Sequence, residues 1–304
     1  MAVVTLAVIS GGCAATNGVS KTGRVPVAER PVAKDATREE LLEKYNTFAA
    51  SVKSLNSTVE LKTTAGSKYS GLIQEYHEVK AFLLSSRPAN VRMVGQAPVV
   101  GKTIFDMASD GQEFRVWLPT KNKFLLGEVA LERSSEKPLE NLRPQHLTDA
   151  LLWPEIRKEE IALLEEFNDE NARYYVLTVL RGGRQTEIYR KIWFDRADLN
   201  IARLQAYGPK GALLSDVSYK DWQPLTDPRP APGSPQIFPR VVRIDRPHDD
   251  YRLDLQVSKI EFNVNLAADR FQLAQPANSE LVRVEPGTDR KSPTTGSQPK
   301  DPSQ

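Results

Sequence analysis

The first regular pattern along the chain is an apolar stripe at helical spacing. Thr37 is followed three positions later by Glu40, a pair typical of the capping box that opens a helix. Apolar residues then recur every three or four positions, at Leu41, Leu42, Tyr45, Phe48, Ala49 and Val52. This spacing predicts one amphipathic helix over 37–55.

Beyond residue 56 the pattern changes to alternation of apolar and polar positions, which predicts β-strands. Turn residues separate the alternating runs, and Asp110-Gly111 is the strongest hairpin signal among them. The strands expected in this part are 57–64, 69–86, 89–96, 102–109, 112–119 and 122–128.

Residues 134–158 interrupt the alternation, and their prolines surround a short helix expected over 146–153. A second proline-rich stretch, 224–239, is expected to be an exposed or lid-like loop, because proline cannot continue a sheet. The remaining strands are expected over 160–167, 173–181, 186–195, 199–207, 212–222, 239–246 and 250–263.

The chain therefore reads as mainly β with few helices. Roughly a dozen strands follow one another without a strand–helix–strand rhythm, which argues against a parallel nucleotide-binding sheet. Accumulated twist prevents so wide an antiparallel sheet from staying flat. We expect a curved antiparallel sheet or half-open β-barrel.

The composition of the chain argues against several classes of function. The chain of 304 residues has 41 Lys and Arg against 39 Asp and Glu, so its formal charge of +2 does not predict nucleic-acid binding. It has one cysteine and three widely spaced histidines, which gives little support for a disulfide, a metal site or a catalytic triad. We expect no cofactor, no metal and no enzymatic activity.

The amino terminus reads as an export signal. An apolar run over 1–9 is followed by Ser10, Gly11 and Gly12 and then by the single cysteine, Cys13. This order resembles a bacterial lipobox, which implies a signal peptide over 1–13 and lipid attachment at Cys13. An incidental cysteine behind an ordinary export signal is the alternative.

The segments that flank the predicted fold are polar. Residues 14–36 contain two prolines and show no periodicity, so they are expected to form a flexible tether. Residues 286–304 contain no aliphatic or aromatic side chain and are expected to be a disordered tail. The folded domain is then expected over 37–285.

Several predicted strands are apolar on both faces. One face can pack against the helices, but the other needs a second apolar partner, which could be a bound ligand. The candidate ligand-binding residues are Phe82, Leu84, Met93, Phe105, Phe114, Val116, Tyr175, Leu177 and Trp193.

Three stretches carry a resemblance to a known family. The first consists of the hairpins formed by Lys191–Asp195, Ala202–Tyr207 and Asp216–Trp222. The second is the segment that follows the last strand and begins with Val264-Asn265-Leu266, and the third is the loop Gly95–Gly101. Over about 37–285 the chain resembles the LolA/LolB-like superfamily of bacterial lipoprotein carriers and receptors. The resemblance implies helices covering the concave face of the sheet, acyl chains held between them, and membrane contact through Val99 and Val100.

From these observations we expect non-enzymatic binding of lipid or lipoprotein acyl chains, in lipoprotein sorting or lipid transfer. The protein would be a monomer, anchored to the inner leaflet of the outer membrane and facing the periplasm. The main alternative is an envelope sensor on the same fold that binds a regulatory protein. An envelope hydrolase is a further alternative, although the spacing of the histidines gives little support for its catalytic groups.

Overall fold

The computed structural model describes residues 31–67, 72–130, 141, 143–169, 172–183, 186–225 and 230–284. The chain divides into two compact units, Met1–Val32 and Ala33–Gln304, and every helix and strand named below belongs to the second. The expected signal peptide with Cys13, most of the tether and the 286–304 tail lie outside the described residues. Those expectations therefore stay predictions.

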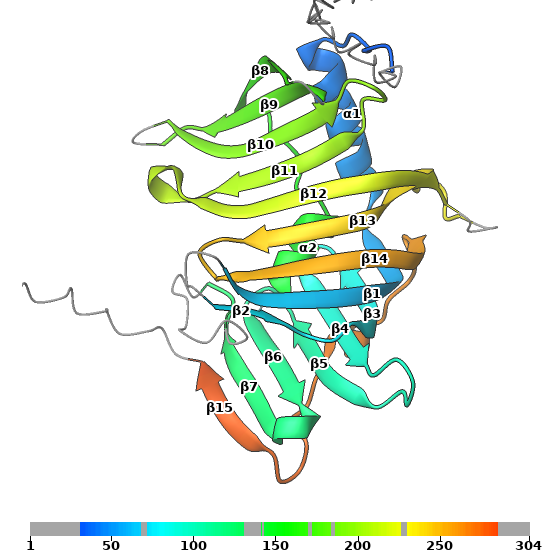
Figure 1. Ribbon diagram of the computed structural model, residues 1–304, viewed down its shortest axis with the longest axis vertical. Coiled ribbons are helices and arrows are strands. Elements are labelled where there is room, and N and C mark those ends of the chain that lie inside the picture. Colours follow the sequence, from blue (N-terminus) through cyan, green and yellow to red (C-terminus); the bar gives the residue numbers. More distant parts are fainter. Residues whose placement is uncertain are drawn as a thin grey trace, which may run out of the picture. The chain divides into compact units, whose positions relative to one another are not determined.

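All fifteen strands of the described residues belong to one sheet, which is curved and open and does not close into a barrel (Figure 1). β2 (Leu72–Glu75) pairs only with the end of β1. Across the sheet the other strands are β15 (Glu280–Val284), β7 (Lys123–Glu128), β6 (Glu113–Leu118), β5 (Thr103–Ser109), β4 (Asn90–Gln96), β3 (Val79–Ser86), β1 (Ser54–Ser67), β14 (Tyr251–Phe262), β13 (Ile237–Arg246), β12 (Leu213–Pro224), β11 (Ile201–Tyr207), β10 (Glu187–Asp195), β9 (Arg173–Arg181) and β8 (Ile161–Asn168).

Two runs of consecutive hairpins make up this sheet. Strands β3 to β7 pair in chain order, and so do β8 to β14, which confirms the antiparallel order expected from the alternation. The runs meet where β1 pairs antiparallel with β14, from Leu55 opposite Phe262 to Ala65 opposite Tyr251. This pair of strands, distant in sequence, joins the two runs of hairpins into one sheet.

Three details of the predicted strands are wrong. The described part of 69–86 is two strands, since Tyr76–Glu78 separate β2 from β3 and both pair with β1. β15 was not expected, because its five residues carry little alternation and its parallel partner β7 lies far back in the chain. Pro224 and Pro239 lie inside β12 and β13, but only near the strand ends, where proline is tolerated.

The helix α1 (Arg38–Ser51) begins as predicted. The Thr37 hydroxyl accepts a hydrogen bond from the Glu40 backbone N–H, and the Glu40 carboxylate accepts one from the Thr37 backbone N–H. The helix ends four residues earlier than predicted. The Arg87 guanidinium donates to the carbonyl oxygens of Ala49 and Val52, at 2.9 and 2.8 Å, and the chain then enters β1.

The second helix, α2 (Gln145–Leu151), lies within two residues of its predicted bounds. The other helical pieces are short 3-10 turns, η1 (Pro119–Lys121), η3 (Pro209–Gly211) and η4 (Ala268–Phe271). None of the helices in the described ranges is long and apolar enough to span a membrane.

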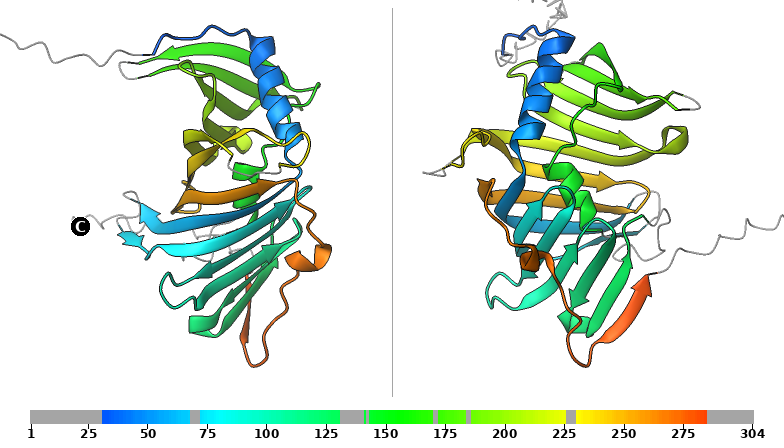
Figure 2. Two further views of the ribbon diagram at one scale, coloured as in Figure 1. Left: turned by 90° about the vertical axis from the view of Figure 1, so that its right-hand side faces the viewer. Right: turned by 180° about the vertical axis from the view of Figure 1, so that it is seen from behind.

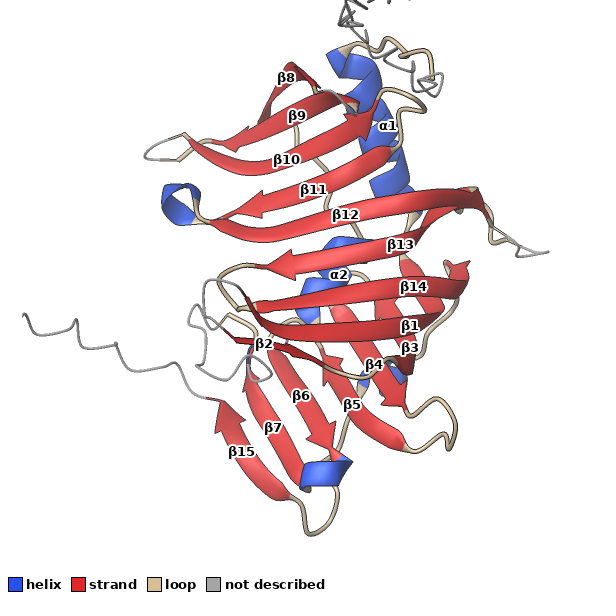
Figure 3. Ribbon diagram, in the orientation of Figure 1, coloured by secondary structure: helices blue, strands red, loops and turns tan. Residues whose placement is uncertain are grey.

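Both helices cover the concave side of the sheet: the view from behind in Figure 2 shows them in front of the strands, and Figure 3 shows them on the far side of the strands. We call this side the helix face and the opposite side the outer face. Strand alternation separates the two: in β14, Tyr251, Leu253, Leu255 and Val257 are buried, while the residues between them are exposed or half-buried. The buried strand residues form one core cluster with residues of α1 and α2.

This assignment of faces predicts unequal costs for two neighbouring substitutions. Leu255 is 1% exposed on the helix face, so Leu255→Ala should lower the free energy of unfolding by about 2–5 kcal/mol. Gln256→Ala on the exposed outer face should change it by no more than about 0.5 kcal/mol. Urea unfolding followed by circular dichroism measures both, and equal effects would contradict the assignment.

Candidate ligand-binding cavity

Five aromatic side chains gather between α1 and the C-terminal half of β12. Trp153 lies at the centre, with its ring centroid 4.3 Å from Phe48 and 5.9 Å from Tyr45 in stacked geometry. Tyr219 and Trp222 meet it edge-on, at 5.3 and 6.2 Å. We call this group the aromatic cluster. Its rings come from three places far apart in the sequence.

Polar atoms of the aromatic cluster are satisfied within the protein. The Trp153 Nε1–H lies 2.9 Å from the Tyr219 hydroxyl, and that hydroxyl donates to the Ala150 carbonyl oxygen at 2.7 Å. The Trp222 Nε1–H donates to the Ile201 carbonyl oxygen at 3.1 Å. Burial raises the pKa of Tyr219 well above its usual value, so its hydroxyl stays neutral. The cluster therefore presents apolar ring surface without a need for water.

One backbone position explains how Trp222 reaches this cluster. Strict alternation from the inward-facing Tyr219 would direct Trp222 to the outer face. Asp221, between them along β12, has a φ of 57°, in the left-handed region, and so interrupts the regular extended backbone. We attribute the inward contact of Trp222 with Phe48 and Trp153 to this interruption.

A cavity of about 550 Å³ lies against the aromatic cluster, within the size range of small-molecule sites. Its wall is formed by α1, by the start of β11 and by Gly233–Ile237 from the proline-rich stretch. The apolar and aromatic residues that line it are Tyr45, Phe48, Trp153, Phe194, Ile201, Trp222, Pro235 and Ile237.

The rim of this cavity is polar. Glu40, Glu43 and Lys44 from α1 line it together with Asn200. Partial burial lowers the pKa of Lys44, and the nearby Asp198 carboxylate opposes that shift. An apolar interior with a charged rim fits an amphiphile better than a fully polar or fully apolar molecule.

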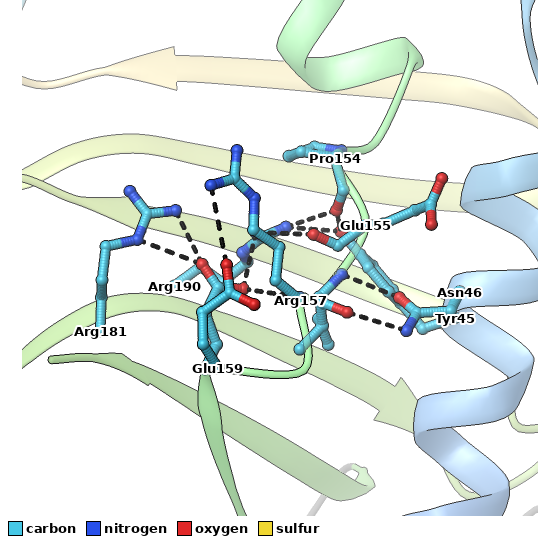
Figure 4. Close-up of polar contacts among 10 residues, drawn as sticks. Tyr45, Asn46, Pro154, Glu155, Arg157, Glu159, Arg181 and Arg190 are labelled. Atoms are coloured by element: carbon cyan, nitrogen blue, oxygen red, sulfur yellow. Dashed lines mark hydrogen bonds and ion pairs between the residues drawn. The ribbon is translucent and has the colours of Figure 1, made fainter.

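The segment Trp153–Glu160, here called the crossing segment, connects α2 to β8 and clamps α1 (Figure 4). The Asn46 side chain exchanges two hydrogen bonds with the backbone of Ile156, at 2.8 and 3.0 Å. Tyr45 donates its hydroxyl proton to the Pro154 carbonyl oxygen at 2.9 Å. These bonds hold α1 at a fixed distance from the sheet.

A buried arginine of the sheet also binds the crossing segment. The Arg190 guanidinium on β10 donates to the carbonyl oxygens of Pro154 and Glu155, at 2.5 and 3.2 Å, and to the Tyr45 hydroxyl at 3.1 Å. Glu160, whose side chain is 1% exposed, lies 3.6 Å from Arg190 and 2.7 Å from Arg181. Arg181 and Arg190 thus hold the carboxylate that ends the crossing segment.

The nine apolar candidates from the sequence do not line this cavity. Met93, Phe114, Val116, Tyr175 and Leu177 are buried in the core cluster, and Phe105 packs against it. Phe82, Leu84 and Trp193 lie on the outer face, since each alternates with buried neighbours. A role of these residues in binding stays a prediction. The sequence missed Phe48, Trp153 and Trp222, whose only signals were an apolar helix stripe and isolated aromatic positions.

The two loop residues Val99 and Val100 lie at the tip of the β4–β5 hairpin. Their exposed fractions are 95% and 75%. The backbone N–H of Gly101, at a φ of 64°, donates to the Ala97 carbonyl oxygen and closes the turn. Two adjacent valines are thus presented to solvent without a covering element among the described residues.

Comparison with known proteins gives distant structural matches. No family model matches the chain, and no curated protein matches it by sequence. A solved LolA superfamily protein from Nitrosomonas europaea is 14% identical, with 79% of this chain and 99% of that chain covered and a TM-score of 0.47. A DUF1329 family protein from Desulfovibrio piger is 13% identical, with 76% and 94% covered and a TM-score of 0.48.

A third similar structure is an outer-membrane lipoprotein-sorting protein domain from Vibrio parahaemolyticus. It is 11% identical, with 76% of this chain and 95% of that chain covered and a TM-score of 0.46. At these values the likeness is distant, and it transfers no residue role to this chain.

The titratable residues that line the cavity within the described ranges are Glu40, Glu43, Lys44 and Tyr45. Across the described ranges no three His, Cys, Asp or Glu side chains are placed to hold a metal ion. The most perturbed acid is Asp149 on α2, a residue that sequence analysis did not single out. Asp149 as a whole residue is exposed, although protein atoms surround its carboxyl group closely. Burial raises the pKa of the Asp149 carboxyl to about 6, against the opposing effects of Arg246 and Arg190.

This shift predicts a pH-dependent effect of Asp149→Asn. A carboxyl with a raised folded-state pKa destabilises the fold once it is ionised, so the variant should be more stable than the wild type above pH 6. The difference should shrink as the pH falls from about 6 to 3.8 and vanish below that range. Urea midpoints at several pH values measure it, and a difference independent of pH would contradict the assignment.

Proposed function

We propose that the protein binds the acyl chain of a lipid, or of an acylated lipoprotein, in the cavity between α1 and the sheet, without covalent chemistry. The observation that carries this proposal is the apolar cavity of about 550 Å³ whose aromatic floor has satisfied polar atoms. Water gains no hydrogen bond from such a floor, so a hydrocarbon chain is the better occupant.

The expected driving force is hydrophobic burial. Each buried methylene contributes about 0.8 kcal/mol, so about ten of them offer roughly 8 kcal/mol before the entropic costs of binding. The charged rim, with Lys44 and Glu43, would stay in contact with the polar end of the ligand. Release would require a movable cover, and α1 and α2 are the candidates.

The cellular role is inferred from the sequence. Lipid attachment at Cys13 would anchor the protein to the inner leaflet of the outer membrane, and residues 14–36 would tether the folded unit in the periplasm. The resemblance to LolA/LolB-like carriers and receptors supports lipoprotein sorting or lipid transfer by a monomer. No feature of the described residues favours the sensor alternative.

A charge placed in the cavity wall tests the binding proposal. Ile237→Asp puts a carboxylate into the apolar wall of the cavity, so the full chain should bind dodecanoate at least about tenfold more weakly by calorimetry. Ile73→Asp is the matched control, because Ile73 is 63% exposed on β2 and outside the cavity. If the wild type does not bind dodecanoate, or if both variants bind it as the wild type does, the proposal fails.

The hairpin tip gives a second test. The double variant Val99→Glu with Val100→Glu should bind vesicles of phosphatidylethanolamine and phosphatidylglycerol several-fold more weakly, because it replaces the exposed apolar pair with charges. Ile161→Glu, at a 52% exposed position on β8, is the control and should bind as the wild type does. Vesicle cosedimentation measures the effect, and unchanged binding of the double variant would refute membrane contact at this tip.

A further inference from the structure

A second and larger cavity adjoins the first. It measures about 930 Å³ and shares Asn200, Ile201 and Trp222 with the acyl cavity. We call it the outer groove, because most of its floor belongs to the outer face of β10 to β13. There Trp193, Arg203, Ser218 and Arg243 are successive cross-strand partners.

The outer groove differs from the acyl cavity in chemistry. Its floor carries paired ions: Arg203 donates to the Asp216 carboxylate with both Nε and Nη2. Arg243 and Asp245, which also line the groove, pair with Asp254 and Arg252 of β14, each at 2.5 Å. Such a floor offers both donors and acceptors to a ligand.

One wall of the outer groove is aromatic. The Trp193 ring has Phe167 5.2 Å away and Tyr174 5.6 Å away, both edge-on, and the Arg203 guanidinium lies 5.5 Å from its centroid. Phe167 is 45% exposed, so part of this wall faces solvent. An aromatic wall beside a floor of donors and acceptors suits a ring that has an apolar C–H face and polar edges.

The charges that line the outer groove make it unfavourable for anionic headgroups. Six aspartates and three cationic side chains line it. The aspartates are Asp169, Asp195, Asp198, Asp216, Asp221 and Asp245, and the cationic residues are Arg203, Lys220 and Arg243. This excess of carboxylates makes the groove unfavourable for a phosphate or a carboxylate. Hydroxyl groups can donate to carboxylates and accept from guanidinium groups without adding charge.

We infer that the ligand is an amphiphile with a neutral sugar headgroup, whose chain occupies the acyl cavity and whose sugar lies in the outer groove. This inference rests on the proposed function, since it needs a chain in the first cavity. Trp222 lies at the boundary and lines both cavities, so the ligand passes beside it from the apolar to the polar side.

Three amphiphiles with the same chain test the headgroup. Dodecyl maltoside, dodecyl phosphate and dodecyltrimethylammonium are titrated into the full chain by calorimetry, each below its critical micelle concentration. Dodecyl maltoside should bind about tenfold more tightly than dodecyl phosphate, the gain expected from one or two net hydrogen bonds. Tighter binding of dodecyltrimethylammonium than of dodecyl maltoside would overturn the sugar assignment in favour of an organic cation.

A pair of variants on one strand locates the headgroup. Phe167→Ala removes an exposed part of the aromatic wall and should weaken dodecyl maltoside binding about three- to tenfold, with dodecyl phosphate unaffected. Leu163→Ala is the matched control, since Leu163 is 49% exposed on the same face of β8 but outside the groove. Trp193→Ala should have a larger effect than Phe167→Ala.

The outcomes separate the two proposals. If all three amphiphiles bind equally and Phe167→Ala changes nothing, the sugar inference fails while acyl binding stands. If none of the three binds, the proposed function itself fails.

Discussion

The structure depends on one constraint, the clamp between α1 and the crossing segment Trp153–Glu160. Arg190 enters it from the sheet and Asn46 from the helix, and both bind backbone groups of that segment (Figure 4). A buried guanidinium requires partners, so the main-chain carbonyl oxygens and Glu160 fix the segment in one position. The helix is thereby held at a set distance from the strands, and large rings fill only part of the space between them.

The acyl cavity follows from that spacing. Trp153, at the start of the crossing segment, receives Phe48 and Tyr45 from α1 on one side and Tyr219 and Trp222 from β12 on the other. Since their N–H and O–H groups bond within the protein, the rings need no further polar partner. The same sheet presents paired Arg and Asp side chains on its outer face, so apolar and polar surfaces meet at Trp222.

Local signals in the sequence predicted most of the elements. Alternation placed the strands of both hairpin runs, and Thr37 with Glu40 placed the start of α1. The β1–β14 pair and the parallel β15 depend on residues distant in sequence, which no local pattern reports. The cavity was missed for the same reason: Phe48, Trp153 and Trp222 meet only after the fold forms. Alternation alone does not tell which face the helices cover, so Phe82 and Trp193 were predicted beside core residues; both lie on the outer face, Trp193 in the wall of the outer groove.

Fluorine NMR of the full chain labelled with 5-fluorotryptophan tests the central claim most directly, that a cavity beside Trp153 takes a hydrocarbon chain. The sequence has four tryptophans, so each resonance can be assigned with single Trp→Phe variants. On addition of dodecanoate the resonances of Trp153 and Trp222 should shift and saturate together, while that of Trp117 on β6 stays in place. Unchanged Trp153 and Trp222 resonances at saturating dodecanoate would contradict the account.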